Sequence, residues 1–276
     1  MSQQTPVNRV EPVWREWMKR WPTPSDLAHA SPAEVLISWS TMGYPRRALR
    51  LQESARVISE RTDGFPRTYE ELLELPGVGP WQGEWPDDPR YDPELLQHGD
   101  RRNVIDRFRY WTMAAIVEQL DAERHPFHVA IENWQHDMNI GSIVRSANAF
   151  GANTVHIVGR KRWNKRGAMV TDRYQHLRHH ATVDDLMAWA REEGLTVVAV
   201  DNTPGSVALE RTRLPRRCLL VFGQEGPGVS DETQDRADLT VSIAQFGSTR
   251  SINAGVAAGI VMHTWVAQHA DLDQAW

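Results

Sequence analysis

Three short segments in the second half of the chain hold the residue types best suited to chemistry. They are residues 139–145 (NIGSIVR), 222–228 (FGQEGPG) and 251–255 (SINAG). Each combines polar or glycine residues with an adjoining apolar run, so each can place hydrogen-bond donors and a close backbone approach at the end of a strand. We expect the three segments to form one site.

In order and spacing, the three segments resemble the three motifs of the SpoU (TrmH-type) RNA ribose methyltransferases of the SPOUT superfamily. The resemblance covers roughly the last 150 residues. It implies an enzyme that moves a methyl group from S-adenosylmethionine to a ribose 2′-hydroxyl of RNA. It also implies an α/β-knot fold, whose trefoil knot builds the donor pocket, although nothing in the periodicity indicates a knot. In this superfamily the active site forms across a homodimer, in which one subunit holds the donor and the other contributes the arginine of the first motif.

The resemblance makes Arg145 the catalytic arginine, which contacts the target ribose and its phosphate. A guanidinium stays protonated far above neutral pH, so it is a poor free base. We interpret Arg145 as a positioning group that stabilises the developing 2′-alkoxide, with proton loss coupled to methyl transfer. A role for Arg145 as the base itself stays open.

The remaining motif residues have both structural and functional interpretations. Asn139 stands where a strand meets a helix and can serve as an N-cap. Glu225 lies in a glycine-rich turn and matches the family's motif-two glutamate, where it can orient the arginine or accept hydrogen bonds from ribose. A capping asparagine, a tight turn and a capping box need no chemistry by themselves. With the resemblance, the catalytic candidates are Asn139, Arg145, Glu225, Ser251 and Asn253, and the cofactor-binding candidates are Gly223, Ile243 and Ile252.

We expect no metal site. S-adenosylmethionine carries its own leaving group as a sulfonium, so the reaction needs alignment and charge stabilisation rather than a metal ion. The single cysteine, Cys218, can supply neither an internal disulfide nor a cysteine cluster, which fits a reducing cytoplasm. Three histidines lie close together in the sequence, His176, His179 and His180. They lack partner cysteines or acids at metal-site spacing, so we expect them to contact RNA or to be exposed.

A basic stretch follows the second strand expected in this half. Residues 160–167 (RKRWNKRG) hold five cationic side chains and one tryptophan, and Arg173 and Arg178 follow. Such a run is often only a solvated loop. Because the domain resembles RNA-modifying enzymes, we interpret the stretch as an RNA contact surface.

From residue 125 on, apolar runs alternate with helical patterns. Strands are expected at 127–131, 154–158, 196–200, 219–222 and 239–243, and helices at 142–150, 184–193 and 252–268. This alternation predicts an α/β domain with a mainly parallel sheet.

The first eighty residues predict helices instead. Ser31 and Thr68 are each followed three residues later by a glutamate, as at the start of a capped helix. The last helix stops at residues 75–79 (LPGVG), a hairpin whose backbone N–H groups can approach a phosphate. From Gln3 to Gly79 this part resembles the helix-hairpin-helix adenine DNA glycosylases of MutY type.

Three departures from that family argue against glycosylase chemistry. Its catalytic glutamate lies upstream of the segment where this chain begins, and its catalytic aspartate and four-cysteine iron–sulfur cluster lie downstream of the hairpin. The segment after Gly79 is rich in proline, glycine and acids, so it is unsuited to form the second helix of the hairpin. We expect a fusion junction near residues 79–81 and a catalytically empty extension.

These patterns divide the 276-residue chain into three parts. Residues 1–80 form a truncated, all-α glycosylase-like segment, residues 81–124 an extended linker to about Gly99 and a helix at 104–120, and residues 125–276 the SpoU-type methyltransferase domain. The net charge of −5 excludes a uniformly basic surface but not a local basic patch. No stretch is long and apolar enough to cross a bilayer, so we expect a cytoplasmic protein without a membrane partner.

The leading hypothesis is an S-adenosylmethionine-dependent RNA 2′-O-ribose methyltransferase whose substrate is either tRNA or rRNA, a choice that the sequence leaves open. One alternative is a non-catalytic nucleic-acid-binding protein that uses the hairpin and the basic stretch, which a test of donor binding would separate. Another is a DNA base-excision glycosylase, which a nicking assay on mismatched duplex would reveal.

Overall fold

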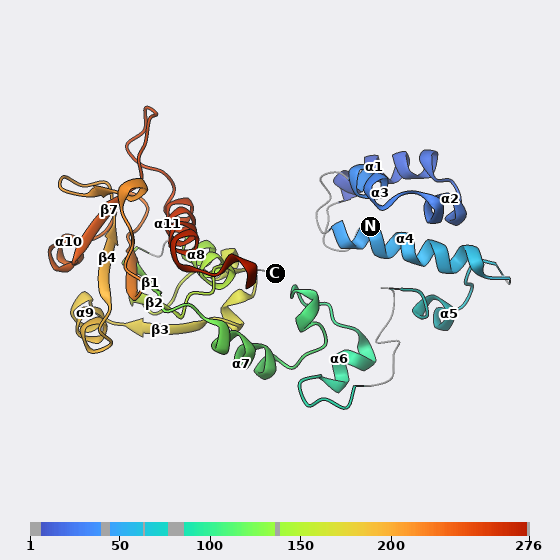
Figure 1. The fold of residues 1–276 in the computed structure, drawn as a ribbon, viewed down its shortest axis with the longest axis horizontal. Coiled ribbons are helices and arrows are strands. Elements are labelled where there is room, and N and C mark those ends of the chain that lie inside the picture. The colour runs from blue at the N-terminus through green and yellow to red at the C-terminus, as the bar shows by residue number, and fades with distance from the viewer. Residues whose placement is uncertain (1–6, 40–44, 63, 77–85, 136–138, 275–276) are drawn as a thin grey trace. The chain divides into compact units, whose positions relative to one another are not determined.

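Figure 1 shows the fold as a computed structural model, which describes residues 7–39, 45–62, 64–76, 86–135 and 139–274. The chain divides into two compact units, Met1–Thr112 and Met113–Trp276. The helical part and the α/β part of the chain therefore fall into different units.

The first unit is helical, as predicted for the first eighty residues. Helices α1 to α5 span Val7–Arg20, Pro24–His29, Pro32–Trp39, Pro45–Glu60 and Tyr69–Leu73. Thr68 begins α5 with a capping box, because its hydroxyl accepts the N–H of Glu71 and the Glu71 carboxylate accepts the N–H of Thr68. The predicted hairpin includes residues 77–79, which lie outside the described residues.

Residues 86–112 contain more local structure than the expected linker. Helix α6 spans Pro93–His98 and is capped by Asp92, with a proline in its first turn. The helix expected at 104–120 begins only at Met113, where α7 spans Met113–Glu123, and a short 3₁₀ helix, η2, covers Asp106–Phe108. Tyr110 interrupts the helical path, because its φ is +65° and its N–H bonds to the carboxylate of Asp100 at 2.9 Å.

The second unit is built on a parallel sheet of seven strands in the order β3-β2-β1-β6-β4-β7-β5. The strands β1 to β7 are His128–Asn133, Thr154–Gly159, His176–His180, Thr196–Val200, Val207–Ala208, Cys218–Phe222 and Leu239–Ser242. The helices α8 to α11 are Ile140–Ala149, Val183–Glu192, Asp231–Arg236 and Ala254–His269, and the 3₁₀ helices η3 to η6 are Arg166–Ala168, Thr171–Arg173, Leu209–Arg211 and Leu272–Gln274. The predicted α/β class and mainly parallel sheet are confirmed (Figure 1). The threading of the chain into a knot stays a prediction.

The sheet is buried on both faces. Val129 and Ile131 of β1 pack in one apolar cluster with α8 and α11, whereas Ala130 between them packs in a second cluster with α9. Strand β6 lies in the middle and is buried along its whole length. Its Cys218 is a core residue whose thiol pKa burial raises to about 12, so it is not a reactive thiol.

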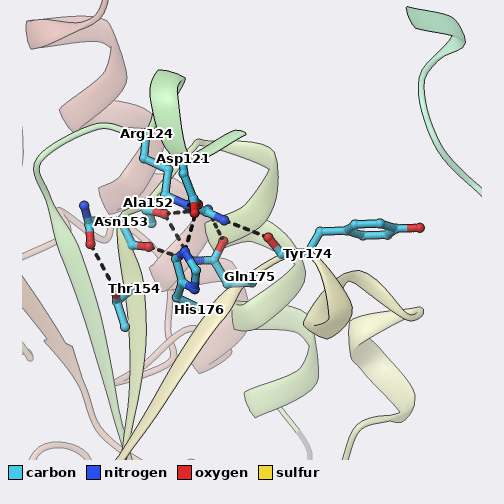
Figure 2. A network of polar contacts seen from close by, with 8 residues as sticks. All are labelled: Asp121, Arg124, Ala152, Asn153, Thr154, Tyr174, Gln175 and His176. Carbon is cyan, nitrogen blue, oxygen red and sulfur yellow. Dashed lines mark hydrogen bonds and ion pairs between the residues drawn. The ribbon is translucent and has the colours of Figure 1, made fainter. Parts of the chain in front are cut away.

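A buried arginine fixes the end of α7 to this sheet (Figure 2). The side chain of Arg124, only 4% exposed, donates to the carbonyl oxygens of Ala152 and Tyr174 at 3.3 and 2.7 Å. Asp121 pairs with both Arg124 and His176, at 2.7 and 2.8 Å. These groups lower the pKa of Asp121 although its partial burial acts in the opposite direction. We propose that the methyltransferase domain includes α7 and thus begins near Met113 rather than at residue 125.

Candidate active site

The structure brings one side chain from each of the three motifs together. The amide nitrogen of Asn139 donates to Oε2 of Glu225 at 2.9 Å. The amide nitrogen of Asn253 donates to Oδ1 of Asn139 at 2.9 Å and to the same Glu225 oxygen at 3.2 Å. Residues separated by 28 to 114 positions in the sequence therefore share one hydrogen-bonded cluster.

The helix starts beside this cluster explain how it is positioned. Asn253 is the N-cap of α11, since its Oδ1 accepts the N–H groups of Gly255 and Val256 at 3.0 and 3.2 Å. Glu225 accepts a further N–H, that of Ala254, at 3.2 Å. Asn139 occupies the N-cap position of α8, but its side chain caps nothing there. The capping interpretation is thus confirmed for Asn253 and wrong for Asn139, whose amide joins the other two motifs instead.

The glycine-rich turn that holds Glu225 requires its glycines. Gln224 and Gly228 exchange two backbone hydrogen bonds at 3.1 and 3.0 Å, and Gly226 and Gly228 have φ values of +95° and +76°. A Cβ on Gly223 would lie 1.9 Å from the carbonyl carbon of Gly228, so only glycine fits at that position. The backbone after β6 therefore closes tightly on itself.

A pocket lies where β4, β6 and β7 end, the edge at which parallel α/β sheets commonly bind ligands. Its lining includes all three cofactor-binding candidates, Gly223, Ile243 and Ile252. Two of the catalytic candidates, Glu225 and Ser251, line it as well.

Sequence reasoning missed two polar residues of this pocket, Asp201 and Asn202. Asp201 accepts the N–H of Val229 at 2.7 Å, and Asn202 donates to the carbonyl of Arg250 at 3.2 Å. Together they hold the loop after β4 against the second and third motifs. Their position directly after the strand at 196–200 was the available signal.

Arg145 is not among the residues that line the pocket of its own chain. It lies on the exposed side of α8, next to the buried Ile143 and Val144, and does not line the pocket. The pocket lining therefore includes the predicted donor-binding residues but not the predicted arginine.

The basic stretch is held firmly by the domain although its charges are exposed. The buried Asn133 donates to the carbonyls of Arg160 and Arg162 at 2.7 and 2.9 Å. A Cβ on Gly141 would lie 2.7 Å from the N of Ala168, so the end of the stretch packs directly on the start of α8. The five cationic side chains, Arg160, Lys161, Arg162, Lys165 and Arg166, are exposed beside the helix that carries Arg145.

The expectation that the three histidines contact RNA or are exposed is wrong for His180, which is 5% exposed. Its Nε2 lies 2.9 Å from Nδ1 of His156, and Nε2 of His156 lies 3.2 Å from Nδ1 of His128. The ring of Trp189 packs 4.1 Å from that of His156. The chain thus contains a histidine ladder, formed across β1, β2 and β3 by the partly buried His128 and the buried His156 and His180.

Burial is the main reason that these rings are held neutral. It lowers the pKa of His128 to about 4 and, together with the neighbouring histidines and Arg178, the pKa of His156 to about 2. His176 and His179 are exposed, as expected. Sequence pattern missed β3 because its residues, HLRHH, are mostly polar.

Comparison with known families finds two matches, one to each kind of domain expected from the sequence. Residues 126–263 match the SpoU rRNA Methylase family. The chain belongs to the SpoU rRNA Methylase family. Residues 1–190 match the HhH-GPD superfamily of base excision DNA repair proteins, to which the chain also belongs through its N-terminal part. Residues 126–190 of that second match contain β1, β2 and β3, α8 and most of α9. They therefore lie within Met113–Trp276, which we call the SpoU unit.

Relatives of known name fall into the same two groups. The chain is 60% identical to an adenine DNA glycosylase of Mycolicibacterium smegmatis over 80 residues, which are 29% of this chain and 27% of that protein. It therefore spans about a quarter of the length of this relative. It is 26% identical over 153 residues to the tRNA (guanosine(18)-2′-O)-methyltransferase of Escherichia coli K12, which covers 54% of this chain and 67% of that protein.

A solved structure supports the fold of the SpoU unit. The A. aeolicus TrmH/SpoU tRNA modifying enzyme superimposes with a TM-score of 0.50 at 22% identity, over 56% of this chain and 83% of that one. Both resemblances expected from the sequence are thus confirmed. None of the helices in the described part of the chain is long and apolar enough to cross a membrane.

Proposed function

We propose that this member of an RNA methyltransferase family transfers a methyl group from S-adenosylmethionine to a ribose 2′-hydroxyl of tRNA or rRNA. The observation that carries the proposal is the cluster of Asn139, Glu225 and Asn253 beside a pocket lined by Gly223, Ile243 and Ile252. The Escherichia coli relative is named for the same reaction on a tRNA guanosine.

The pocket residues fit an adenosyl donor. Ile243, Ile252 and Phe222 offer apolar contact, while Gly223 lines the pocket in a turn that closes on Gly228 only because Gly223 has no Cβ. Polar groups of Asp201 and Asn202 lie at the same pocket and can accept or donate hydrogen bonds to a ribose. When bound, S-adenosylmethionine supplies an electrophilic methyl group on a sulfonium.

The hydrogen-bonded cluster would keep the three motifs in one arrangement. Glu225 receives N–H groups from Asn139, Asn253 and Ala254, so its carboxylate is fixed by three donors. Ser251, exposed at the pocket, can bind the acceptor ribose. We assign to these residues the preorganisation of the site, which lowers the barrier without reorganisation during the reaction.

We assign to Arg145 the stabilisation of charge on the ribose oxygen. Its guanidinium is a poor free base, and the lining of the donor pocket in its own chain does not include it, which suits a contribution to the site of a partner subunit. Exposed Val256 and Ile260, one turn apart on α11, give an apolar patch that a homodimer would cover. The basic stretch then contacts RNA phosphates, and the protein acts in the cytoplasm.

The decisive experiment incubates the chain with S-adenosylmethionine carrying a labelled methyl group and unmodified tRNA or rRNA. We expect label in a 2′-O-methylated nucleoside identified by mass spectrometry after digestion. Arg145→Ala should abolish transfer but leave donor affinity, measured by calorimetry, unchanged. Donor binding without methylation of any RNA would contradict the proposed reaction, and absence of donor binding would favour the non-catalytic nucleic-acid-binding protein.

A mixing experiment tests the shared active site. Mixed dimers of an Arg145→Ala subunit and a Gly223→Ala subunit should regain activity, because one of the two sites in each mixed dimer combines an intact arginine with an intact pocket. If Arg145 serves its own subunit, both sites stay defective and mixing restores nothing.

A further inference from the structure

Strand β1 ends in a buried carboxylate that lies outside the donor pocket. Glu132 is only 1% exposed and follows three buried apolar residues, Val129, Ala130 and Ile131. The pocket lining does not include it. A carboxylate is costly to bury unless hydrogen-bond donors surround it, so the identity of its donors indicates its role.

Four hydrogen bonds reach the two oxygens of Glu132. Oε1 accepts the hydroxyls of Ser230 and Thr233, both at 2.6 Å. Oε2 accepts the backbone N–H of Ser230 at 3.0 Å and the indole N–H of Trp134 at 3.3 Å. Ser230 is also the N-cap of α10, since its hydroxyl oxygen accepts the N–H of Thr233 at 3.3 Å. Glu132 therefore fixes the start of α10.

The start of α10 lies close to the glycine-rich turn of residues 222–228, which we call the motif-two turn. This turn ends two residues before Ser230. Near its other end, the side chain of Gln224, 6% exposed, accepts the N–H of Gln135 at 2.5 Å. Residues 132–135 thus hold the motif-two turn near both of its ends.

The last residue of β1 binds a different segment. Successive side chains of a strand point to opposite faces, so Glu132 and Asn133 face opposite ways. The fully buried Asn133 donates to the carbonyls of Arg160 and Arg162 in the basic stretch. Glu132 therefore holds the motif-two turn, whereas Asn133 holds the basic stretch.

We propose that Glu132 is a positioning residue of the methyltransferase site, which acts through the motif-two turn without contact to donor or RNA. Every residue of that turn lines the donor pocket, and Glu225 within it accepts the hydrogen bonds of Asn139 and Asn253. A turn that is free to shift would misplace both the pocket and Glu225, and a misplacement of about 1 Å can cost about 100-fold in rate. This inference rests on the proposed function in taking methyl transfer as the reaction.

The first test compares rates of methyl transfer by the full chain at saturating donor and RNA. Glu132→Ala should lower this rate by about tenfold to about 100-fold and leave RNA affinity unchanged, because Asn133 still holds the basic stretch. Ile116→Ala is the control, since it truncates a buried side chain of α7 and destabilises the SpoU unit without touching the turn. Equal rates for the two variants would overturn the proposal.

A double-mutant cycle separates positioning from a general loss of stability. If Glu132 acts through the turn, removal of Glu225 leaves little for Glu132 to position. The double variant Glu132→Ala, Glu225→Ala should therefore be little slower than Glu225→Ala alone. Two independent losses of rate, which multiply in the double variant, would contradict action through Glu225.

Two milder variants guard against a folding defect. Glu132→Gln keeps one carbonyl oxygen for the two N–H donors, and the hydroxyls of Ser230 and Thr233 can rotate to accept from its amide. This variant should recover most of the rate. Ser230→Ala leaves the carboxylate in place but removes one hydroxyl donor, so it should lose part of the rate. A wild-type rate in Ser230→Ala would overturn the proposal even if Glu132→Ala did not fold.

Donor affinity, measured by calorimetry, tests the role of Glu132 without any methyl transfer. Glu132→Ala should raise the dissociation constant for S-adenosylmethionine about fivefold, the equivalent of one net hydrogen bond, whereas Ile116→Ala should not. A wild-type chain that binds the donor but methylates no RNA would contradict the proposed function. The donor affinities of the two variants would then still decide for or against Glu132.

Discussion

The SpoU unit brings polar groups of three distant segments together at one site, whereas the described part of the N-terminal unit has one small apolar cluster. In the SpoU unit, two apolar clusters cover both faces of the sheet and three motifs meet at its edge. In the N-terminal unit, one apolar cluster is formed around Trp17 and Trp39.

This difference shows that high sequence identity over part of a fold does not imply an assembled site. The N-terminal residues share 60% identity with a glycosylase but correspond to only 27% of it. The SpoU unit shares only 26% identity with its methyltransferase relative but covers 67% of it and keeps all three motifs. Function follows the assembled site rather than the degree of likeness.

Removal of Glu225 should produce the largest effect on the SpoU side of this comparison. Glu225→Ala removes the acceptor shared by Asn139, Asn253 and Ala254, so turnover should fall about 100-fold or more, as when a preorganised polar group is lost. Asn253→Ala should act in the same direction. The measurement is the rate of methyl transfer at saturating donor. Glu232→Ala, on the exposed side of α10, is the control. Equal rates of methyl transfer for Glu225→Ala and the control would show that Glu225 does not contribute to the site.

Gly223→Ala should weaken donor binding next most strongly. The new Cβ would meet the Gly228 carbonyl carbon at 1.9 Å, so the turn must open and the pocket must change shape. We expect the dissociation constant for S-adenosylmethionine, measured by calorimetry, to rise at least about tenfold, or about 1.4 kcal/mol. Gly259→Ala in α11, where a Cβ meets nothing within 4 Å, should bind the donor normally. Unchanged affinity in Gly223→Ala would place the donor elsewhere.

Acid should destabilise the SpoU unit through the histidine ladder. Unfolding raises the pKa of His128 from about 4 and that of His156 from about 2 toward 6.5, so the unfolded state takes up protons first as the pH falls. Above pH 6.5 these histidines do not reduce the free energy of unfolding. Below that pH, each ladder histidine that the fold keeps neutral reduces it by up to about 1.4 kcal/mol per pH unit.

Urea titrations between pH 7 and pH 4 check this prediction. His156→Leu should reduce the dependence of unfolding free energy on pH, although it also lowers stability at pH 7 by leaving His128 and His180 without their partner. His98→Leu, at an exposed position in the N-terminal unit, is the matched control. An unaltered pH dependence in His156→Leu would mean that the ladder does not couple to folding.

Truncation should have the smallest effect and compares the two units most directly. A chain beginning near Trp81 keeps the whole SpoU unit, so it should methylate RNA about as well as the full chain. Loss of methylation on truncation at Trp81 would show that the glycosylase-like residues help to hold substrate.

The isolated residues 1–80 should show no base excision on mismatched duplex in a nicking assay. Nothing among the described residues of this segment forms a site comparable to the cluster around Glu225. Strand cleavage above background would reinstate the glycosylase alternative.

The sequence by itself determined the elements with strong local patterns. Strand β4 has the predicted bounds, Thr196–Val200, because a strand buried on both faces is a continuous apolar run. Thr68 and Glu71 predicted their capping box because its partners lie three residues apart. The three motifs were likewise visible, since each occupies a few consecutive residues, and the structure places Gly223, Ile243 and Ile252 in one pocket as expected.

Only the tertiary structure decided which distant groups meet. Asn139 caps nothing and bonds to Glu225 because sheet order places β1 beside β6, a pairing that no local pattern encodes. His180 is buried because β2 and α9 cover it, although its polar neighbours predicted exposure. Tyr110 leaves the helical path for a hydrogen bond to Asp100, ten residues earlier. Periodicity reports hydrogen bonds within a few residues, whereas these contacts depend on how whole elements pack.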